Sequence, residues 1–227
     1  MIHSAAVHRS PNAIILLGSA ETIMRAAIEN MLSMQHRMNA RVHEDWIAQN
    51  FEWYRAAWIE CGELMDHVGY KWWKKQTADM EQVRLEVIDI WHFGMSAMFT
   101  PSCDIPELAR QIELDLYHTE PETADIHQAT EALALHCLQH RTFSVPLFAQ
   151  LMLACELNFD DLYRHYVGKN VLNFFRQDHG YKTGEYVKIW QGREDNEHLS
   201  EIIDSLDSTT EGFPDDVYAE LTRRYQA

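Results

Sequence analysis

The 227-residue chain has few basic residues, few turn-forming residues and no long apolar run. Lys and Arg total 19 against 35 Asp and Glu, which gives a formal net charge of −16. Binding to nucleic acid or to an anionic membrane depends on a surplus of Lys and Arg, so this balance argues against both partners. An anionic ligand would have to be met by a local group of cations.

Cysteine is also scarce. The four cysteines are widely spaced and form no CxxC pair, which fits a reducing, cytoplasmic setting. The longest apolar run, AIILL at 13–17, is far too short to cross a bilayer and lacks the flanks of a signal peptide. We therefore expect a cytoplasmic protein with no membrane partner.

Nine glycines and six prolines leave few turns, and the dominant hydrophobic period is helical. No internal repeat or linker divides the chain, so we expect one all-α domain over 1–227, built as a helical bundle. The segment 177–196, with Gly-containing turns and alternating aromatics, is expected to be an ordered loop. The expected helices are 20–42, 51–68, 79–99, 105–117, 121–139, 144–156 and 158–178.

Two pairs of carboxylates stand three residues apart in the stretches IECGELMDHVGYKWWKK and LEVIDIWHF. Glu60 and Glu63 share a face of one expected helix, and Glu86 and Asp89 share a face of the next. If these helices pack antiparallel, the four carboxylates converge and require a counterion. Hard divalent cations such as Mg²⁺ prefer oxygen ligands. Either pair alone fits a solvated helix face better, but the second pair is embedded among apolar residues.

Basic residues are concentrated after the first acidic pair and in KNVLNFFRQDHGYKTGEYVKIW. They are Lys71, Lys74, Lys169, Arg176, Lys182 and Lys188. In so acidic a chain, cations beside a metal site indicate a polyphosphate ligand, although each lysine could also simply neutralise nearby acids. There is no GxxxxGK[ST] and no GxGxxG, so a P-loop or a Rossmann site is not supported.

The two acidic stretches and the later segment KNVLNFFRQDHGYKTGEYVKIWQGREDN together closely resemble the dimeric, all-α dUTPase family. An upstream QHRMN is similar to that family's nucleoside-binding QxxLN pattern, with Met38 where leucine is usual. The resemblance covers roughly 30–100 and 160–200, in the expected order. It leaves 101–155 as a helical insert.

The resemblance implies a Mg²⁺-dependent dUTP diphosphatase that forms dUMP and pyrophosphate, with dUDP as a second substrate that would release phosphate. The implied metal ligands are Glu60, Glu63, Glu86 and Asp89. In the mechanism we favour, Glu60 or Glu63 takes the proton of the attacking water. The implied phosphate contacts are Lys74, Lys169, Asn173, Arg176, Tyr181 and Lys188. The implied nucleoside contacts are Gln35, Asn39, Phe93 and Asn196, and the carboxamides of the first two can match the edge of uracil.

A homodimer is also implied by the resemblance. The expected helices 79–99 and 144–156 are apolar around much of their circumference, which we interpret as surface in excess of what one small bundle needs.

Two other functions remain open. One is an all-α nucleoside triphosphate pyrophosphatase with a different base preference, for dCTP or for a broad range; the pair Gln35 and Asn39 argues against it. The other is an acidic helical regulator that binds a repressor, which the acidity supports only weakly.

Five further residues have two interpretations each. Asp66 is either a third acid at the site or a partner of Lys71. Trp72 and Trp91 either stack a base or belong to the core, the commoner role of large aromatics. His136 and His140 have a metal-ligand spacing, but a surface helix is the better interpretation.

Overall fold

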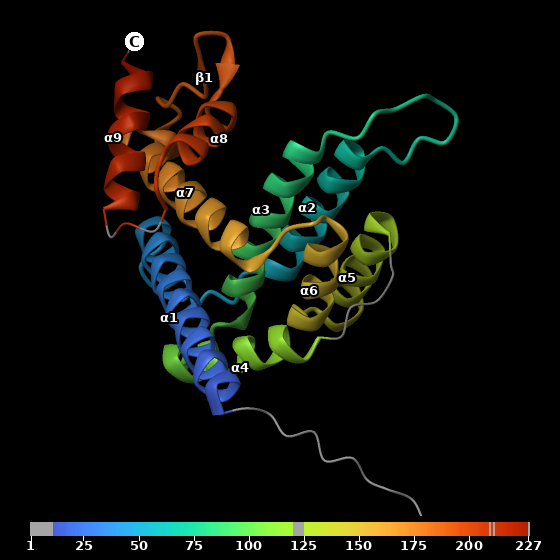
Figure 1. Cartoon of the computed structure of the whole chain (residues 1–227). Helices are drawn as coiled ribbons and strands as arrows, with labels where there is room; N and C mark the ends of the chain where they lie inside the picture. Colours follow the sequence, from blue (N-terminus) through green and yellow to red (C-terminus); the bar gives the residue numbers. More distant parts are fainter. Residues whose placement is uncertain (1–10, 120–124, 209, 211, 227) are drawn as a thin grey trace, which may run out of the picture.

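The computed structural model describes residues 11–119, 125–208, 210 and 212–226, with side chains described from Ile23 onward (Figure 1). The described chain is almost entirely helical, which confirms the all-α prediction. Among these residues, none of the helices is long and apolar enough to cross a membrane. All four cysteines are free thiols.

The helices of the described ranges are α1 (Pro11–Val42), α2 (Trp53–Val68), α3 (Met80–Met98), α4 (Ile105–His118), α5 (Ile126–His140), α6 (Val145–Ala154), α7 (Phe159–Asp178), α8 (Asp195–Ser205) and α9 (Phe213–Tyr225). A 3₁₀ turn covers Tyr181–Thr183. Two short strands, β1 (Ile189–Trp190) and β2 (Arg193–Glu194), pair antiparallel.

Several helices begin at a side-chain cap that the sequence supplies. Asp79, Asp125, Ser144 and Asn158 each accept a hydrogen bond from a backbone N–H in the first turn of α3, α5, α6 and α7. At the end of α2, Gly69 has a φ of 93°, a conformation that side chains with a Cβ rarely adopt. The connection to α3 therefore starts with a sharp change of direction.

Three expectations are corrected. Helix α1 starts at Pro11, earlier than expected, and α5 starts at Ile126, while residues 120–124 lie outside the described ranges. The segment 177–196 is not a loop throughout, because it contains the 3₁₀ turn, the strand pair and the first residues of α8. Helices α8 and α9 were not expected, since their apolar stripes are short and lie within otherwise polar sequence.

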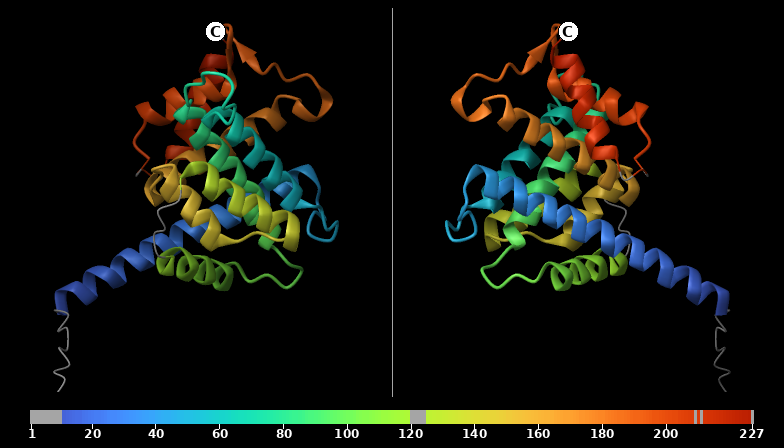
Figure 2. Two further views of the ribbon diagram at one scale, coloured as in Figure 1. Left: turned by 90° about the vertical axis from the view of Figure 1, so that its right-hand side faces the viewer. Right: turned by 90° about the vertical axis from the view of Figure 1, so that its left-hand side faces the viewer.

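The long pair α2 and α3 lies at the centre of the bundle, and its two helices pack side by side (Figures 1 and 2). Helix α5 packs on α2, and α6 packs on α3, so together they cover one side of the pair. Helices α1 and α7 also pack on α3, and α4 lies against α1 and α6. One connected hydrophobic core includes residues from every helix, α1 to α9.

The apolar circumference of α3 is therefore covered within this chain. Val87, Ile88, Ile90, Trp91 and Met95 are all buried against neighbouring helices. Much of the apolar surface of α6 is packed on α3, α4 and α5, but Leu153 is 48% exposed. Our interpretation of α3 as surplus surface for a dimer was wrong, while that of α6 stays a prediction.

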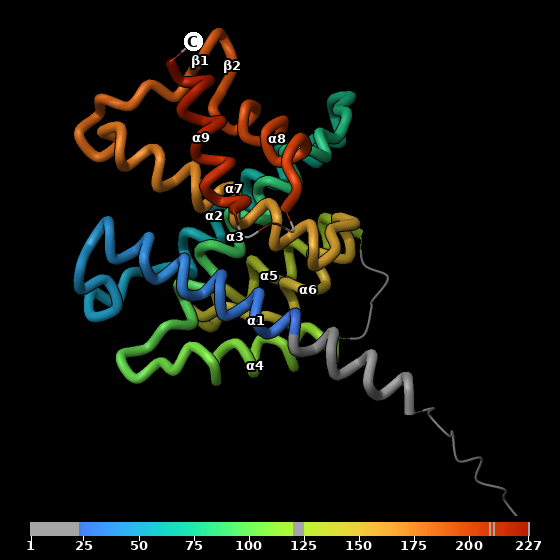
Figure 3. Tube along the Cα trace, turned by 60° about the vertical axis from the view of Figure 1, so that its left-hand side comes forward, coloured from blue at the N-terminus to red at the C-terminus, as the bar shows by residue number. Residues whose placement is uncertain are grey.

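The C-terminal helices α8 and α9 pack on each other and on α7 (Figure 3). At Gly168 in α7, an added Cβ would lie 2.4 Å from the Cδ1 atom of Ile203 in α8. The close approach of these two helices depends on the missing side chain. Helix α7 is thus held between the C-terminal part and the bundle, which fixes its basic residues relative to α3.

A prediction concerns Gly94 in α3. A Cβ there would lie 2.4 Å from the ring of Phe143, so Gly94→Ala should lower the free energy of unfolding by about 1–3 kcal/mol. The control is Gly62→Ala in α2, where no atom lies within 4 Å of the added Cβ; this substitution should stabilise by about 0.5–1 kcal/mol. Chemical denaturation of both variants measures the difference. Equal effects would show that the Phe143 contact does not constrain α3.

Candidate metal and nucleotide site

Helices α2 and α3 bring three carboxylates together. Ligand oxygens of Glu60, Glu63 and Glu86 all lie within 4.8 Å of one another. Glu86 is buried, Glu60 is half-buried and Glu63 is exposed, so the group is open to solvent on one side. A single cation placed among them can contact all three residues.

Asp89 lies beside a lysine. Its Oδ2 atom is 2.8 Å from the Nζ atom of Lys169, which reaches across from α7. Within the described chain, the group that can hold a metal consists of the other three acids, and Asp89 is outside it. Asp89 as a fourth metal ligand stays a prediction. To bind a metal, its carboxylate would have to contact the ion and Lys169 together, or separate from Lys169.

The electrostatics of this acidic group favour a bound cation. Burial raises the pKa of Glu60 to about 9, and the charges of Asp89, Glu86 and Glu63 add to the effect. Burial also raises the pKa of Glu86, with Asp89 adding and Lys169 opposing. Ionising neighbouring, partly buried carboxylates together costs free energy. A hard divalent cation, which prefers oxygen ligands, would offset that cost.

A cavity of about 430 Å³ adjoins the carboxylates. Its charged end is formed by Glu60, Asp89, Lys169 and Arg176, together with Asn173. The other end is lined by two carboxamides and a group of rings, among them Gln35, Asn39, Trp46, Phe51, Trp53 and Phe93. The rings of Trp53 and Phe93 stack at 6.2 Å between centroids. The cavity thus combines a place for an anion with a place for a flat polar ring.

The basic residues of the cavity are held by their neighbours. Two nitrogens of Arg176 each lie 2.8 Å from an oxygen of Asp195, which is fully buried, and the hydroxyl of Tyr186 donates to the same carboxylate at 2.8 Å. Burial by itself would raise the pKa of Asp195, but Arg176 outweighs it and lowers the pKa. Asn196 accepts hydrogen bonds from Lys169 at 3.2 Å and from Arg176 at 3.5 Å. The guanidinium therefore has a defined orientation at the cavity wall.

Not all of the predicted contacts lie at this cavity. Tyr181 lines it, with its ring centroid 5.9 Å from the guanidinium carbon of Arg176. Lys188 lies 3.0 Å from Glu194, and Lys74 is exposed on the α2–α3 connection; neither lines the cavity. Asn196, predicted to contact the nucleoside, does not line the cavity either, and the roles of Lys74, Lys188 and Asn196 stay predictions.

The residues with two interpretations are now placed. Asp66 pairs with Lys71 at 2.7 Å on the surface, and it is not part of the carboxylate group in the described chain. Trp91 is buried in the core, whereas the side chain of Trp72 is 90% exposed. The ring of His136 lies 4.7 Å from that of another histidine, His140, at the exposed end of α5.

A hydrogen-bond network fixes the amide end of the cavity. Gln35 donates to Asn39 at 3.1 Å and to Ser96 at 3.0 Å, and Asn39 donates to Ser96 at 2.9 Å. The oxygen of Gln35 lies 2.8 Å from the Nδ1 atom of His92 and 3.0 Å from the hydroxyl of Tyr166. Both predicted nucleoside amides are therefore buried, bonded to each other and held by α3 and α7.

Five residues whose side chains orient the predicted site residues were not predicted from the sequence. They are His92, Ser96, Tyr166, Tyr186 and Asp195. Only His92 had a usable signal, since it lies one helical turn after Asp89 within an acidic stretch already singled out. The remaining four occupy ordinary helix or loop positions whose partners are distant in the chain.

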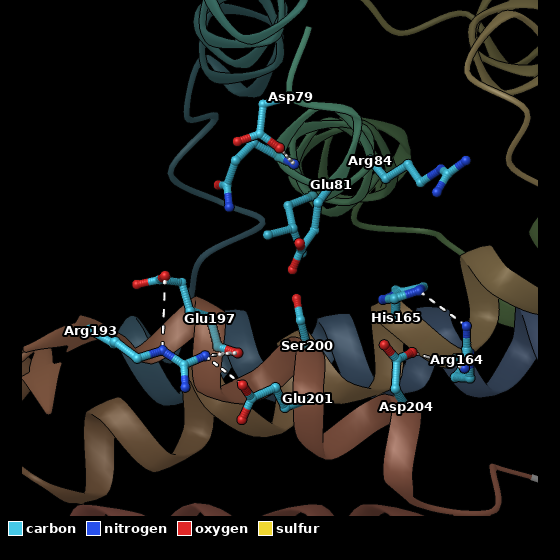
Figure 4. A pocket seen from close by; sticks show the side chains of 12 residues that line it. Asp79, Glu81, Arg84, Arg164, His165, Arg193, Glu197, Ser200, Glu201 and Asp204 are labelled. Atoms are coloured by element: carbon cyan, nitrogen blue, oxygen red, sulfur yellow. Dashed lines mark hydrogen bonds and ion pairs between the residues drawn. The ribbon is translucent and has the colours of Figure 1, made fainter. Parts of the chain in front are cut away.

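A second and larger cavity, of about 590 Å³, lies between the start of α3 and helices α7 and α8 (Figure 4). Two of its three arginines are paired with nearby acids: Arg164 with Asp204, and Arg193 with Glu197 and Glu201. The converging carboxylates do not line it. We therefore place the candidate site at the smaller cavity.

Comparison with protein-family models matches residues 27–181 to the family described as dUTPase. The matched range includes the three carboxylates, Asp89, both amides and the basic residues of α7. It ends before Asp195 and Asn196, which orient those basic residues. A search of curated proteins found no match.

A prediction follows from the raised pKa of Glu60. Without metal, the unfolded chain ionises this carboxyl above about pH 4.5, while the folded chain resists ionisation up to about pH 9, so stability is lost as the pH rises through this window. Glu60→Gln removes that cost and should raise the unfolding free energy of the metal-free protein at pH 8 by about 1–3 kcal/mol, with little effect at pH 5.

Denaturation in the presence of a chelator measures this effect. The control is Glu131→Gln, which removes an exposed carboxyl on α5 and should change stability little at either pH. A Glu60→Gln variant that is equally stable or less stable at pH 8 would contradict the electrostatic description of the carboxylate group.

Proposed function

The chain belongs to the all-α dUTPase family, and on that premise we propose that it hydrolyses dUTP to dUMP and pyrophosphate with Mg²⁺ as its cofactor. Hydrolysis of dUTP is the activity of the family; the metal, the products and dUDP as a second substrate are our proposal. The observation that supports it best is the group formed by Glu60, Glu63 and Glu86 beside a cavity with cations at one end and rings at the other.

The carboxylates are proposed to hold the metal, with Asp89 as a further ligand. Bound Mg²⁺ would offset charge on the phosphate oxygens and acidify a water molecule. Glu60 or Glu63 is proposed to accept the proton of the attacking water. Glu60 is the better placed of the two, since it lines the cavity.

The phosphates are proposed to bind at the charged end of the cavity. Lys169, Arg176, Asn173 and Tyr181 line it and offer donors to anionic oxygens. Asn196 would hold Lys169 and Arg176 in place beside the nucleotide. Lys74 and Lys188 would have to approach from outside the cavity, and Lys188 would have to leave Glu194.

The nucleoside is proposed to bind at the amide end. Gln35 and Asn39 provide the polar surface, and Phe93, four residues after Asp89 on α3, presses against the sugar or the base. Aromatic rings around these groups exclude water, which strengthens each hydrogen bond to the base.

We further propose that the protein is a single domain, that it forms a homodimer and that it works in the cytoplasm. The connected core from α1 to α9 supports the first point. Exposed apolar side chains on α2 and α5 support the second: Trp58, Ile59, Leu135 and Leu138. A solution mass measurement tests the dimer.

Turnover of a panel of deoxynucleoside triphosphates tests the function directly. With Mg²⁺, dUTP should be hydrolysed to dUMP and pyrophosphate at least about 100-fold more efficiently than dCTP, and a chelator should abolish turnover. Comparable turnover of dCTP or of several bases would favour the pyrophosphatase of other specificity. No turnover of any nucleotide would overturn the proposal.

Asp195 gives a prediction about phosphate binding. Asp195→Asn keeps the shape of the side chain but replaces one accepting oxygen by a donor, so it breaks the two-point pairing with Arg176. We expect kcat/KM for dUTP to fall by about 10- to 100-fold. The control is Glu201→Gln, which removes an exposed carboxylate that pairs with Arg193 and Arg224 away from the cavity, and activity should persist. Equal effects would show that the pairing with Arg176 does not serve the site.

A further inference from the structure

The hydrogen atoms of the amide network can be assigned from Ser96. Its Oγ atom lies 2.9 Å from the carbonyl oxygen of His92 in the preceding turn of α3. A carbonyl only accepts, so the hydroxyl donates its single hydrogen there. The same Oγ must then accept from the two amides near it, Gln35 at 3.0 Å and Asn39 at 2.9 Å. Both amides therefore turn their nitrogen toward Ser96.

This orientation uses the whole hydrogen-bonding capacity of Gln35. Its two hydrogens go to Ser96 and to the Oδ1 atom of Asn39. Its oxygen faces the Nδ1 atom of His92 and the hydroxyl of Tyr166, whose single hydrogen is shared between this oxygen and the carbonyl oxygen of Met31, each 3.0 Å away. Gln35 has no donor left for a ligand, whereas Asn39 keeps one hydrogen on Nδ2 and one lone pair on Oδ1.

The orientation also fixes the tautomer of His92. The oxygen of Gln35 only accepts, so the Nδ1 atom of His92 carries a hydrogen. Burial lowers the pKa of this imidazole to about 4, which keeps the ring neutral. The Nε2 atom is then a bare acceptor. It is buried without a hydrogen-bond partner in the described chain, and the ring of His92 borders the cavity.

A buried acceptor without a partner costs free energy unless a ligand supplies the donor. Deoxyuridine carries two donors outside its phosphates, N3–H of the base and the 3′-hydroxyl. His92 lies at the amide end, where its Nδ1 atom meets the oxygen of Gln35 and Gln35 in turn donates to Asn39. Since the sugar lies between the base and the phosphates, the amide end receives the base.

We propose that the Nε2 atom of His92 accepts a hydrogen bond from N3–H of uracil, and that Gln35 is a positioning residue that sets the tautomer of His92. This inference rests on the proposed function. Asn39, with one donor and one acceptor free, would contact a neighbouring carbonyl of the base. Cytosine has a lone pair at N3, which would meet the lone pair of His92. The histidine therefore distinguishes uracil from cytosine.

Calorimetric binding of non-hydrolysable α,β-imido analogues of dUTP and dCTP, with Mg²⁺ present, tests the proposal. His92→Phe removes the acceptor but keeps a ring against Tyr166, whose centroid lies 4.3 Å away. Affinity for the uracil analogue should fall by about ten- to a hundredfold, while affinity for the cytosine analogue should not fall. His92→Gln, which brings an amide oxygen near the position of Nε2, should restore part of the preference.

A second arm uses the 2′,3′-dideoxy form of the uracil analogue. Wild-type protein should bind it about as well as the deoxy form if His92 contacts N3–H. A loss on removing the 3′-hydroxyl that His92→Phe abolishes would assign the histidine to the sugar and overturn the proposal. An unchanged uracil preference in folded His92→Phe would overturn it as well.

Nitrogen NMR of the wild-type imidazole gives a readout that does not depend on a variant folding. His92 should show a protonated Nδ1 and an unprotonated Nε2, and the Nε2 resonance should shift when the uracil analogue binds. The opposite tautomer, or no shift on binding, would contradict the inference. Hydrolysis of dUTP by wild-type protein is measured in parallel, so that its absence marks failure of the proposed function and its presence isolates the role of His92.

Discussion

Mutual repulsion among Glu60, Glu63 and Glu86 is the constraint around which this structure is organised. Their ligand oxygens lie within 4.8 Å because α2 and α3 pack tightly through their apolar sides. Burial of Leu64 and Val87 offsets the cost of placing these carboxylates in a partly buried site, where burial first and neighbouring charges second raise the pKa of Glu60. The helix pair thus holds carboxylates in an arrangement that ionises freely only when a cation is present. Binding of a cation to this group would be coupled to stability for the same reason.

Polar groups around the cavity are likewise oriented by hydrogen bonds to neighbouring side chains. Arg176 is aligned by the buried Asp195, and Gln35 is saturated by Ser96, His92 and the groups beside them. Such preorganisation lets binding proceed with little ordering of side chains. It also moves the selective contact away from the residue that the motif indicates. Gln35 belongs to the QHRMN pattern, yet the unpaired acceptor is on His92.

A feature could be predicted from the sequence where its signal lies within one segment of the chain. It could not where it depends on contacts between residues far apart in the chain. Helical periodicity is local and long in α1 to α7, so their existence and the shared faces of the two acidic pairs were predictable. The pairing of Asp89 with Lys169 joins residues far apart in the chain and depends on how α7 crosses α3. Helices α8 and α9 are short and largely polar, and they are recognisable only from their packing on α7. The proposed role of His92 was not predictable, because it depends on contacts among α1, α3 and α7 and on the direction of the hydroxyl hydrogen of Ser96.

Helix α3 connects the two ends of the site. Glu86, Asp89, His92, Phe93 and Ser96 fall on one face of it, at steps of three and four residues. The stretch from Glu86 to Ser96 spans about 15 Å of a rigid helix. One element therefore sets the distance between the acidic group of α2 and α3 and the hydrogen-bond network around Gln35. The opposite face of α3 is tightly packed, because the ring of Phe143 lies against Gly94 and leaves no room for a Cβ atom there. A shift of α3 along its axis would move both groups at once relative to α1, α2 and α7, so the tight packing of its far side also fixes the geometry of the candidate site.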